Sequence, residues 1–242
     1  AIGRCTASRG DVIVVMPGHT ETISAAAGIA MDVAGVAVIG LGYGSLRPTI
    51  NYTATASTLT MSAANCTLVN ILHTGGIDAV VSPIVVSAAD CLILSNEIRD
   101  VTGQVTNGIL TTAGATRLKI LKHIHDGDSA AGTGAGIAIV GGDGIEITID
   151  RMDGNFSVGG IDVRTTATTD LFVHDVLYFR TRNAADIFLV DTITASTGQI
   201  GPNINIRLQD NAANVTEAIT GATFVVVDPV YVVNLAGEKA ML

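Results

Sequence analysis

The sequence contains no tryptophan, and aromatic residues make up only 4% of its 242 positions. Proteins that hold bases or sugar rings usually stack them on aromatic side chains, so this shortage weakens both a nucleic-acid-binding and a carbohydrate-binding interpretation. Charged residues are also few, at 14%, and the net charge is −9. Because a negative protein repels phosphate backbones and anionic lipid heads, we expect neither nucleic acid nor a membrane as a partner.

Cysteine is scarce as well. Cys5, Cys66 and Cys91 are an odd number and too few for a disulfide scaffold, so we expect reduced thiols.

No charged segment leads into an apolar one after Ala1, so no signal peptide is visible, although upstream residues can be missing. Residues 25–44 could cross a membrane by length alone, but they lack flanking Lys, Arg and aromatic residues, which favours strands and turns.

Hydrophobic residues are plentiful, at 48%, and they follow a repeat. A small residue and a turn-forming or polar residue lead into alternating apolar positions. Copies of this phrase begin at residues 34, 64, 89, 115, 142, 168, 195 and 222, about 27 residues apart. The alternation has period 2 and no helical period, so it predicts an all-β solenoid of about eight coils of about 27 residues, with strands stacked in parallel.

Residues at the same phase of successive coils should form columns along the stack, about 4.8 Å apart. Cys66 and Cys91 share a phase and should stack inside. A second interior column is predicted from Ile77, Ile109, Ile137, Ile161 and Ile187.

The segment from Gly10 to Ile23 contains a strand that ends in Met16-Pro17-Gly18, and it is followed by a second strand, Val36–Gly40, that ends in Ile-Gly. Here the chain resembles right-handed parallel β-helix proteins of the pectate-lyase-like superfamily, and most of all those encoded by tailed bacteriophages. The resemblance implies a single-stranded right-handed parallel β-helix. Residues 1–9 would be the tail of an N-terminal capping helix, residues 10–221 the coils, and residues 222–242 the last coil and a C-terminal cap or assembly segment.

Polar residues also share phases. Asp100, Asp126 and Asp153 lie eleven positions after their repeat starts, and Glu97, His123 and Asp150 lie eight positions after theirs. Carboxylates stacked about 5 Å apart repel one another, which raises a pKa or recruits a cation such as Ca²⁺. The candidate calcium ligands are Asp100, Asp126, Asp128 and Asp153, and the candidate catalytic residues of a polysaccharide lyase or hydrolase are Glu97, His123, Asp126, Asp150 and Asp153. In the competing interpretation these residues only satisfy turn backbones, as every coil of a solenoid requires.

The known catalytic patterns of the superfamily are missing. Arg47-Pro48 does not continue into an Arg-x-Pro-x-x-Arg element, and neither a Gly-His-Gly set nor the Trp of the methylesterases is present. A glycine-rich stretch at residues 36–44 lacks the third glycine and the following helix of a dinucleotide-binding motif, so we expect no cofactor other than Ca²⁺.

Two functions follow. The first is a structural protein of a bacteriophage virion, a capsid decoration or a tail spike or fibre, that forms a homotrimer and contacts other capsid or tail proteins. Its basis is the resemblance together with uncharged outer positions, which usually meet a partner. The alternative is an extracellular polysaccharide-degrading enzyme that acts on host surface polysaccharide through the acidic columns.

Overall fold

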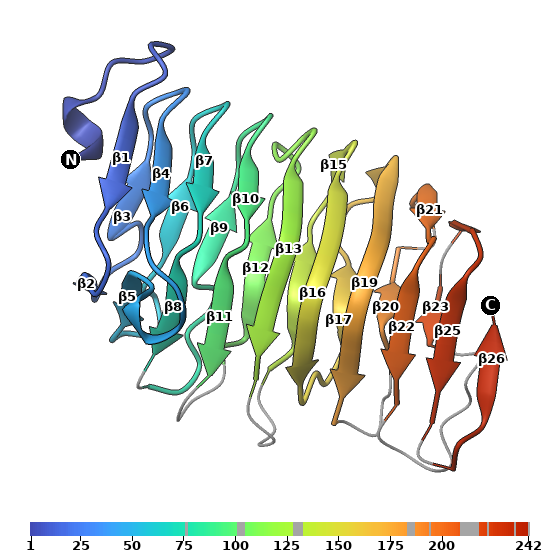
Figure 1. Cartoon of the computed structure of the whole chain (residues 1–242). Helices are drawn as coiled ribbons and strands as arrows, with labels where there is room; N and C mark the ends of the chain where they lie inside the picture. The colour runs from blue at the N-terminus through green and yellow to red at the C-terminus, as the bar shows by residue number, and fades with distance from the viewer. Residues whose placement is uncertain are drawn as a thin grey trace.

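The computed structural model describes residues 1–75, 77–100, 105–127, 133–182, 187–193, 195–208, 218–221, 223–234 and 236–241. These residues form a parallel β-solenoid of about seven turns with roughly 27 residues per turn, which confirms the predicted all-β solenoid. Figure 1 shows the turns stacked side by side from the blue N-terminal end to the red C-terminal end. Within the described ranges, no helix has the length and apolar character that a bilayer crossing requires.

The larger sheet begins as two separate strips of parallel strands. The first strip contains β1 (Val12–Val15), β4 (Ala37–Gly40), β7 (Thr67–Val69) and β10 (Leu92–Leu94). The second strip contains β2 (Thr20–Ile23), β5 (Thr49–Tyr52), β8 (Leu72–Gly75) and β11 (Glu97–Asp100). Three long strands then run through both strips: β13 (Lys119–Asp126), β16 (Glu146–Gly154) and β19 (Leu171–Thr181). The strips therefore fuse into one wide face in the middle of the molecule (Figure 1).

Towards the C-terminus the strips separate again. The first continues through β21 (Gly198–Ile200) and β24 (Val225–Val226), and the second through β22 (Ile204–Arg207) and β25 (Val230–Val233). The last strand, β26 (Lys239–Met241), pairs antiparallel with β25 and so covers that edge of the sheet. This placement falls within residues 222–242, of which Ala222, Leu235 and Leu242 lie outside the described residues.

A third strip forms the opposite wall. Its strands are β3 (Ile29–Met31), β6 (Leu59–Met61), β9 (Ile84–Val86), β12 (Asn107–Thr111), β14 (Ala135–Ile139), β17 (Gly159–Val163), β20 (Leu189–Asp191) and β23 (Ile219–Thr220). A small pair, β15 (Gly142–Asp143) with β18 (Thr168–Thr169), lies at the corner before β16 and β19. Two 3-10 helices, Ile2–Arg4 and Gly44–Leu46, complete the elements of the described chain, and the first lies within the predicted capping segment 1–9.

The interior is filled by columns of aliphatic side chains. Cys66 and Cys91 are both buried and lie on adjacent rungs, because the Leu92 amide donates to the Cys66 carbonyl at 2.9 Å. Their predicted stacking is confirmed. Burial raises the pKa of the Cys66 thiol and brings that of Cys91 to about 11, so both remain protonated thiols at neutral pH.

The predicted isoleucine column is only partly right. Ile109, Ile137 and Ile161 are in register on β12, β14 and β17. However, the neighbouring rungs carry Ile84 and Leu189 in place of Ile77 and Ile187. The connections between strands differ in length from turn to turn, so counting residues from a repeat start loses the phase in the third strip.

Three glycines of the third strip face long side chains that extend from the opposite wall. A Cβ atom on Gly108, Gly136 or Gly160 would lie within 3.0 Å of His125, Met152 or Phe179, respectively. These glycines occupy consecutive rungs, each one residue before Ile109, Ile137 and Ile161. Because these glycines have no side chain, the rings of His125 and Phe179 and the thioether of Met152 have space to extend across the interior.

Candidate functional site

The first predicted acidic column is half correct. Asp126 and Asp153 are aligned on β13 and β16, on the outer face of the second strip. Asp100 is not aligned with them, because Arg99 takes that position on β11 and Asp100 aligns with Gly75. Successive side chains of a strand point to opposite faces, so an offset of one residue sends Asp100 inward. Its buried Oδ2 lies 3.4 Å from Nε2 of the buried His125.

The second predicted column is wrong. His123 is completely buried and aligns with Ile149, whereas Glu97 aligns with Ile124. Register shifts on both sides of His123, and another between Ile147 and Ile149, break the even spacing that the repeat suggested. Because a β-bulge adds one residue to one strand, it turns every later side chain to the other face. His123 and Asp150 therefore do not form a column with Glu97.

Asp153 is the most strongly held carboxylate of the outer face. Its side chain is only 1% exposed, because three guanidinium groups cover it. Arg180 donates from Nη2 at 2.5 Å, Arg182 from Nε at 3.1 Å and Arg151 from Nη2 at 3.4 Å. Burial acts to raise the pKa of Asp153, but the hydrogen bonds from Arg180 and Arg182 outweigh it, so the pKa lies below its usual value.

The neighbouring acids are paired with arginines as well. Glu97 accepts from Nη1 of the buried Arg47 at 2.7 Å and is also bound by Arg99 from the same strand. Asp126 is held by Nη2 of Arg151 at 3.1 Å, so Arg151 bridges Asp126 and Asp153. The outer surface of β11, β13, β16, β19 and β22 is thus an alternation of arginines and carboxylates, which we call the arginine face: Arg99, Asp126, Arg151, Asp153, Tyr178, Arg180, Arg182 and Arg207.

The arginine face stabilises ionised carboxylates, and this does not favour proton transfer by them. A general acid needs a carboxyl group whose pKa is raised towards neutrality, whereas Asp153 is kept ionised by its arginines. His123 lies in the interior, away from the surface that a polymer could reach. Among the described residues no group of three or more His, Cys, Asp or Glu side chains is placed to hold a metal ion, and Asp128 lies outside them.

We expect Asp153→Asn to destabilise the protein by about 2–3 kcal/mol, because the substitution leaves three guanidinium groups around a neutral amide. The measurement is urea unfolding followed by circular dichroism at neutral pH. The matched control is Asp32→Asn, since Asp32 is an exposed carboxylate directly after β3 and its substitution should change the free energy of unfolding by less than about 0.5 kcal/mol. Equal effects of the two substitutions on the free energy of unfolding would show that the contacts between Asp153 and the arginines do not contribute to stability.

A polar cluster lies inside the solenoid, beneath the second strip. The hydroxyl of the buried Tyr52 is 2.8 Å from Nδ1 of His73 and donates to the Pro83 carbonyl at 3.0 Å. Oδ1 of Asn96 lies 3.3 Å from Nε2 of His73. Two turns beyond His73, the rings of His123 and His125 meet edge to face with their centres 6.3 Å apart. Burial lowers the pKa of His73 to about 4 and that of His123 to about 3, so both rings are neutral.

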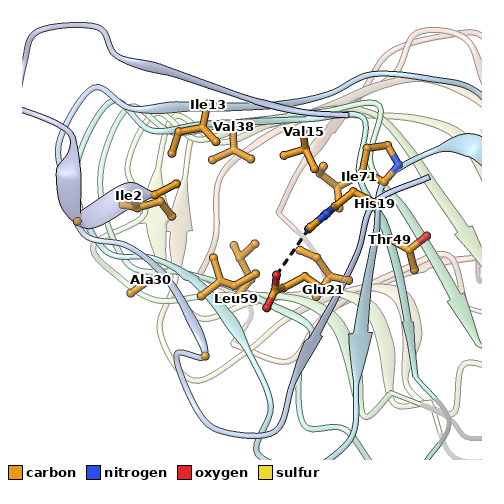
Figure 2. Close-up of a pocket in the computed structure, with 16 residues that line it drawn as sticks. Ile2, Ile13, Val15, His19, Glu21, Ala30, Val38, Thr49, Leu59 and Ile71 are labelled. Carbon is orange, nitrogen blue, oxygen red and sulfur yellow. Dashed lines mark ion pairs between the residues drawn. The ribbon is translucent and has the colours of Figure 1, made fainter. Parts of the chain in front are cut away.

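A cavity of about 430 Å³ opens at the N-terminal end of the solenoid (Figure 2). Its walls are the inward side chains of the first turns, among them Ile13, Val15 and Leu59. His19 and Glu21 stand at one side with Nε2 and Oε2 3.6 Å apart. The cavity is thus the open beginning of the interior columns, and nothing in the structure shows what covers it.

The outer surface of the first strip is apolar. Val14, Ile39, Val69, Leu94 and Leu121 occupy the same outward position on five consecutive strands, and we call them the apolar column. Beside the column, Val12 is 55% exposed and Met16 63% exposed. The charged residues Lys119 and Glu146, paired at 2.6 Å, mark the edge of this surface on β13 and β16.

Sequence reasoning identified Asp126 and Asp153 but missed the arginines between which they lie. The signal was present, because Arg99, Asp126, Asp153, Arg180 and Arg207 follow one another at intervals of 27 residues. A search restricted to acids and histidines, the usual catalytic residues, passes over the basic members of the column. Extending the same count past Asp153 would have found Arg180 and Arg207.

Comparison of the chain with protein-family models, with curated proteins and with solved structures found no match.

Proposed function

We propose that this chain is a structural subunit that works by assembly, and that the apolar column is the surface through which its copies associate. The column spans five rungs, about 19 Å at the strand spacing of a sheet. Val12, Val14 and Met16 are exposed at its N-terminal end, and the other members of the column, Ile39, Val69, Leu94 and Leu121, are partly exposed. Contiguous apolar surfaces of this kind usually mark contact sites.

The kind of assembly follows from the resemblance of residues 10–23 and 36–40 to right-handed β-helix proteins of the pectate-lyase-like superfamily. Among those, the proteins of tailed bacteriophages decorate capsids or form tail spikes and fibres. The proposed location is therefore the virion, and the proposed state is a homotrimer whose three apolar columns face a common axis. The shortage of charged residues, 14% of the chain, supports this assignment, since assembly surfaces are depleted in charge at their centre.

We expect the purified protein to have a native mass near three times 24.7 kDa in light scattering on a sizing column. The double substitution Val69→Lys with Leu94→Lys places two charges on adjacent rungs of the apolar column and should reduce the mass to that of one chain, because burying unpaired ammonium groups is strongly unfavourable.

The matched control is Thr60→Lys with Val85→Lys, which adds two charges to adjacent rungs on the outer side of the third strip and should leave the trimer intact. A wild-type monomer at every concentration tested would overturn the proposal. So would a trimer that survives the substitutions in the apolar column.

A further inference from the structure

The arginine face carries more positive charge than its own carboxylates neutralise. Its five arginines lie around two aspartates, and the neighbouring Glu97 is already shared by Arg47 and Arg99. The guanidinium groups also stay accessible, since 48% of the Arg151 side chain and 35% of the Arg180 side chain are exposed. A guanidinium has more N–H donors than one carboxylate uses, so donors remain for a further acidic group. On a chain of net charge −9, this local surplus favours an acidic protein surface as partner.

Exposed carboxylates lie at the opposite end of the long strands. Asp143 lies three residues before β16, and Asp170 lies directly before β19, where the chain passes from the third strip to the first. Both side chains are exposed, and neither forms an ion pair with a basic side chain among the described residues. We call these two residues the acidic corner. β16 and β19 therefore each begin beside an exposed carboxylate and carry an arginine, Arg151 or Arg180, further along.

The acid and the arginine of each long strand belong to the same turn of the solenoid. In a cyclic trimer whose axis runs along the stack, equivalent turns of the three copies lie at equal heights, because rotation about the axis leaves height unchanged. Each copy presents one flank of its axis-facing surface to one neighbour and the opposite flank to the other neighbour. Such a contact is heterologous, and three copies close it into a ring.

We propose that in the trimer the arginine face of each copy binds the acidic corner of the next copy. Asp143 then approaches Arg151 of the neighbouring copy, and Asp170 approaches Arg180, each at the height of one shared turn. This inference rests on the proposed assembly through the apolar column. The column runs only from β1 to β13, whereas β16 and β19 lie beyond its end, so the charged contacts join the part of the copies that the column does not reach.

The charged contacts also fix how far the copies are shifted along the axis. A column of valine, isoleucine and leucine side chains has no feature that prevents one copy from sliding past another by a turn. Oppositely charged groups on particular turns do prevent it, because a shift of one turn separates the pairs or brings like charges together. The apolar column and the acidic corner thus have different tasks, the first in affinity and the second in alignment.

The test is analytical ultracentrifugation of the full chain over a series of concentrations at low salt. Asp143→Lys with Asp170→Lys places like charges against the arginines and should raise the dissociation concentration of the trimer by at least about tenfold. The matched control, Asp32→Lys with Asp78→Lys, makes the same change in net charge at exposed carboxylates on turns whose second-strip strands, β5 and β8, contain no arginine. It should change the dissociation concentration by less than about twofold.

A variant with the opposite expected effect uses Thr197, which is exposed on the same edge of the solenoid one turn beyond Asp170. Arg207 lies on the turn of Thr197, at the end of β22. Thr197→Asp adds a carboxylate opposite Arg207 of the next copy and should lower the dissociation concentration about threefold. Repulsion between more acidic copies predicts the reverse. Rising salt should weaken the wild-type trimer, because counterions screen the pairs, and weaken the double Lys variant less.

The outcomes separate this inference from the proposed assembly. The inference is overturned if the two pairs of Lys substitutions have equal effects, or if Thr197→Asp weakens the trimer. In either case the loss of the trimer in Val69→Lys with Leu94→Lys still supports assembly through the apolar column. A wild-type monomer at every concentration overturns both. Circular dichroism of each variant shows whether the fold is retained, so a change in mass is assigned to the contact.

Discussion

The free energy of unfolding is expected to fall by about 3–4 kcal/mol when the pH is lowered from 6.5 to 5. His73 and His123 are neutral in the folded protein, with pKa values lowered by burial to about 4 and about 3, whereas an unfolded histidine titrates near 6.5. Below pH 6.5 the unfolded state therefore binds protons that the folded state does not. Each histidine then contributes a slope of about 1.4 kcal/mol per pH unit, which continues until the pH reaches its folded pKa.

The window between pH 6.5 and 5 isolates the histidines, because carboxylates of the unfolded chain remain largely ionised there. Urea unfolding at a series of pH values gives the slope. His123→Leu removes one titrating ring from the interior and should halve it, while His19→Gln changes an exposed ring and should leave it unaltered. A slope in His123→Leu as steep as in the wild type would show that protonation of His123 is not linked to unfolding.

Gly160→Ala is expected to cost about 3 kcal/mol, because the new methyl group has no space. Its Cβ would lie 2.3 Å from Cε2 of Phe179 and 3.0 Å from the Phe188 carbonyl oxygen. Phe179 cannot turn aside, since Phe156 stacks on it with ring centres 6.0 Å apart and Phe188 meets it edge-on at 4.9 Å. Overpacking of a rigid core typically costs about 1–3 kcal/mol, and a clash with a ring that cannot move belongs at the upper end.

Gly136→Ala provides the comparison on the preceding rung. Its Cβ would lie 2.8 Å from the Cε and Sδ atoms of Met152 and 3.0 Å from the Gly160 carbonyl oxygen, so the backbone contact is as close as the one at Gly160. The Met152 side chain is flexible and can shift, so the cost should be about 1 kcal/mol. Adding Phe179→Leu to Gly160→Ala should recover part of the lost stability by removing the ring. Thermal unfolding of the four proteins measures these differences. Equal costs for the two glycine substitutions would contradict the view that rigidity of the facing side chain decides the outcome.

The sequence predicted the solenoid because its period of about 27 residues and its period-2 alternation are set by the same physical requirement. Each turn must return to the same wall with its apolar side chains inward. Cys66 and Cys91 were placed correctly because each lies two residues after its own repeat start and directly before its strand, β7 or β10, so their common phase does not depend on the length of the turn between them. Close to a repeat start, counting residues is equivalent to knowing the register.

Counting failed wherever one residue was added or lost. The register shifts on both sides of His123 turn its side chain into the interior, whereas a regular period places it in solvent. Asp100 is offset by one position, so its side chain lies in the interior and not at the surface. The role of Gly160 was equally hidden, because its meaning depends on Phe179, which lies in another strip. Such features are decided by contacts across the interior, and no single-strand pattern contains them.

Because each turn has roughly 27 residues, the number of turns can change without changing which side chains the other turns present. A turn contacts only the turns beside it, so duplication or loss of one complete turn would keep every remaining column aligned. The added turn would lengthen the arginine face or the apolar column by one rung and leave the ends unchanged. Duplication of whole turns can therefore lengthen either surface while the register of the remaining turns stays the same.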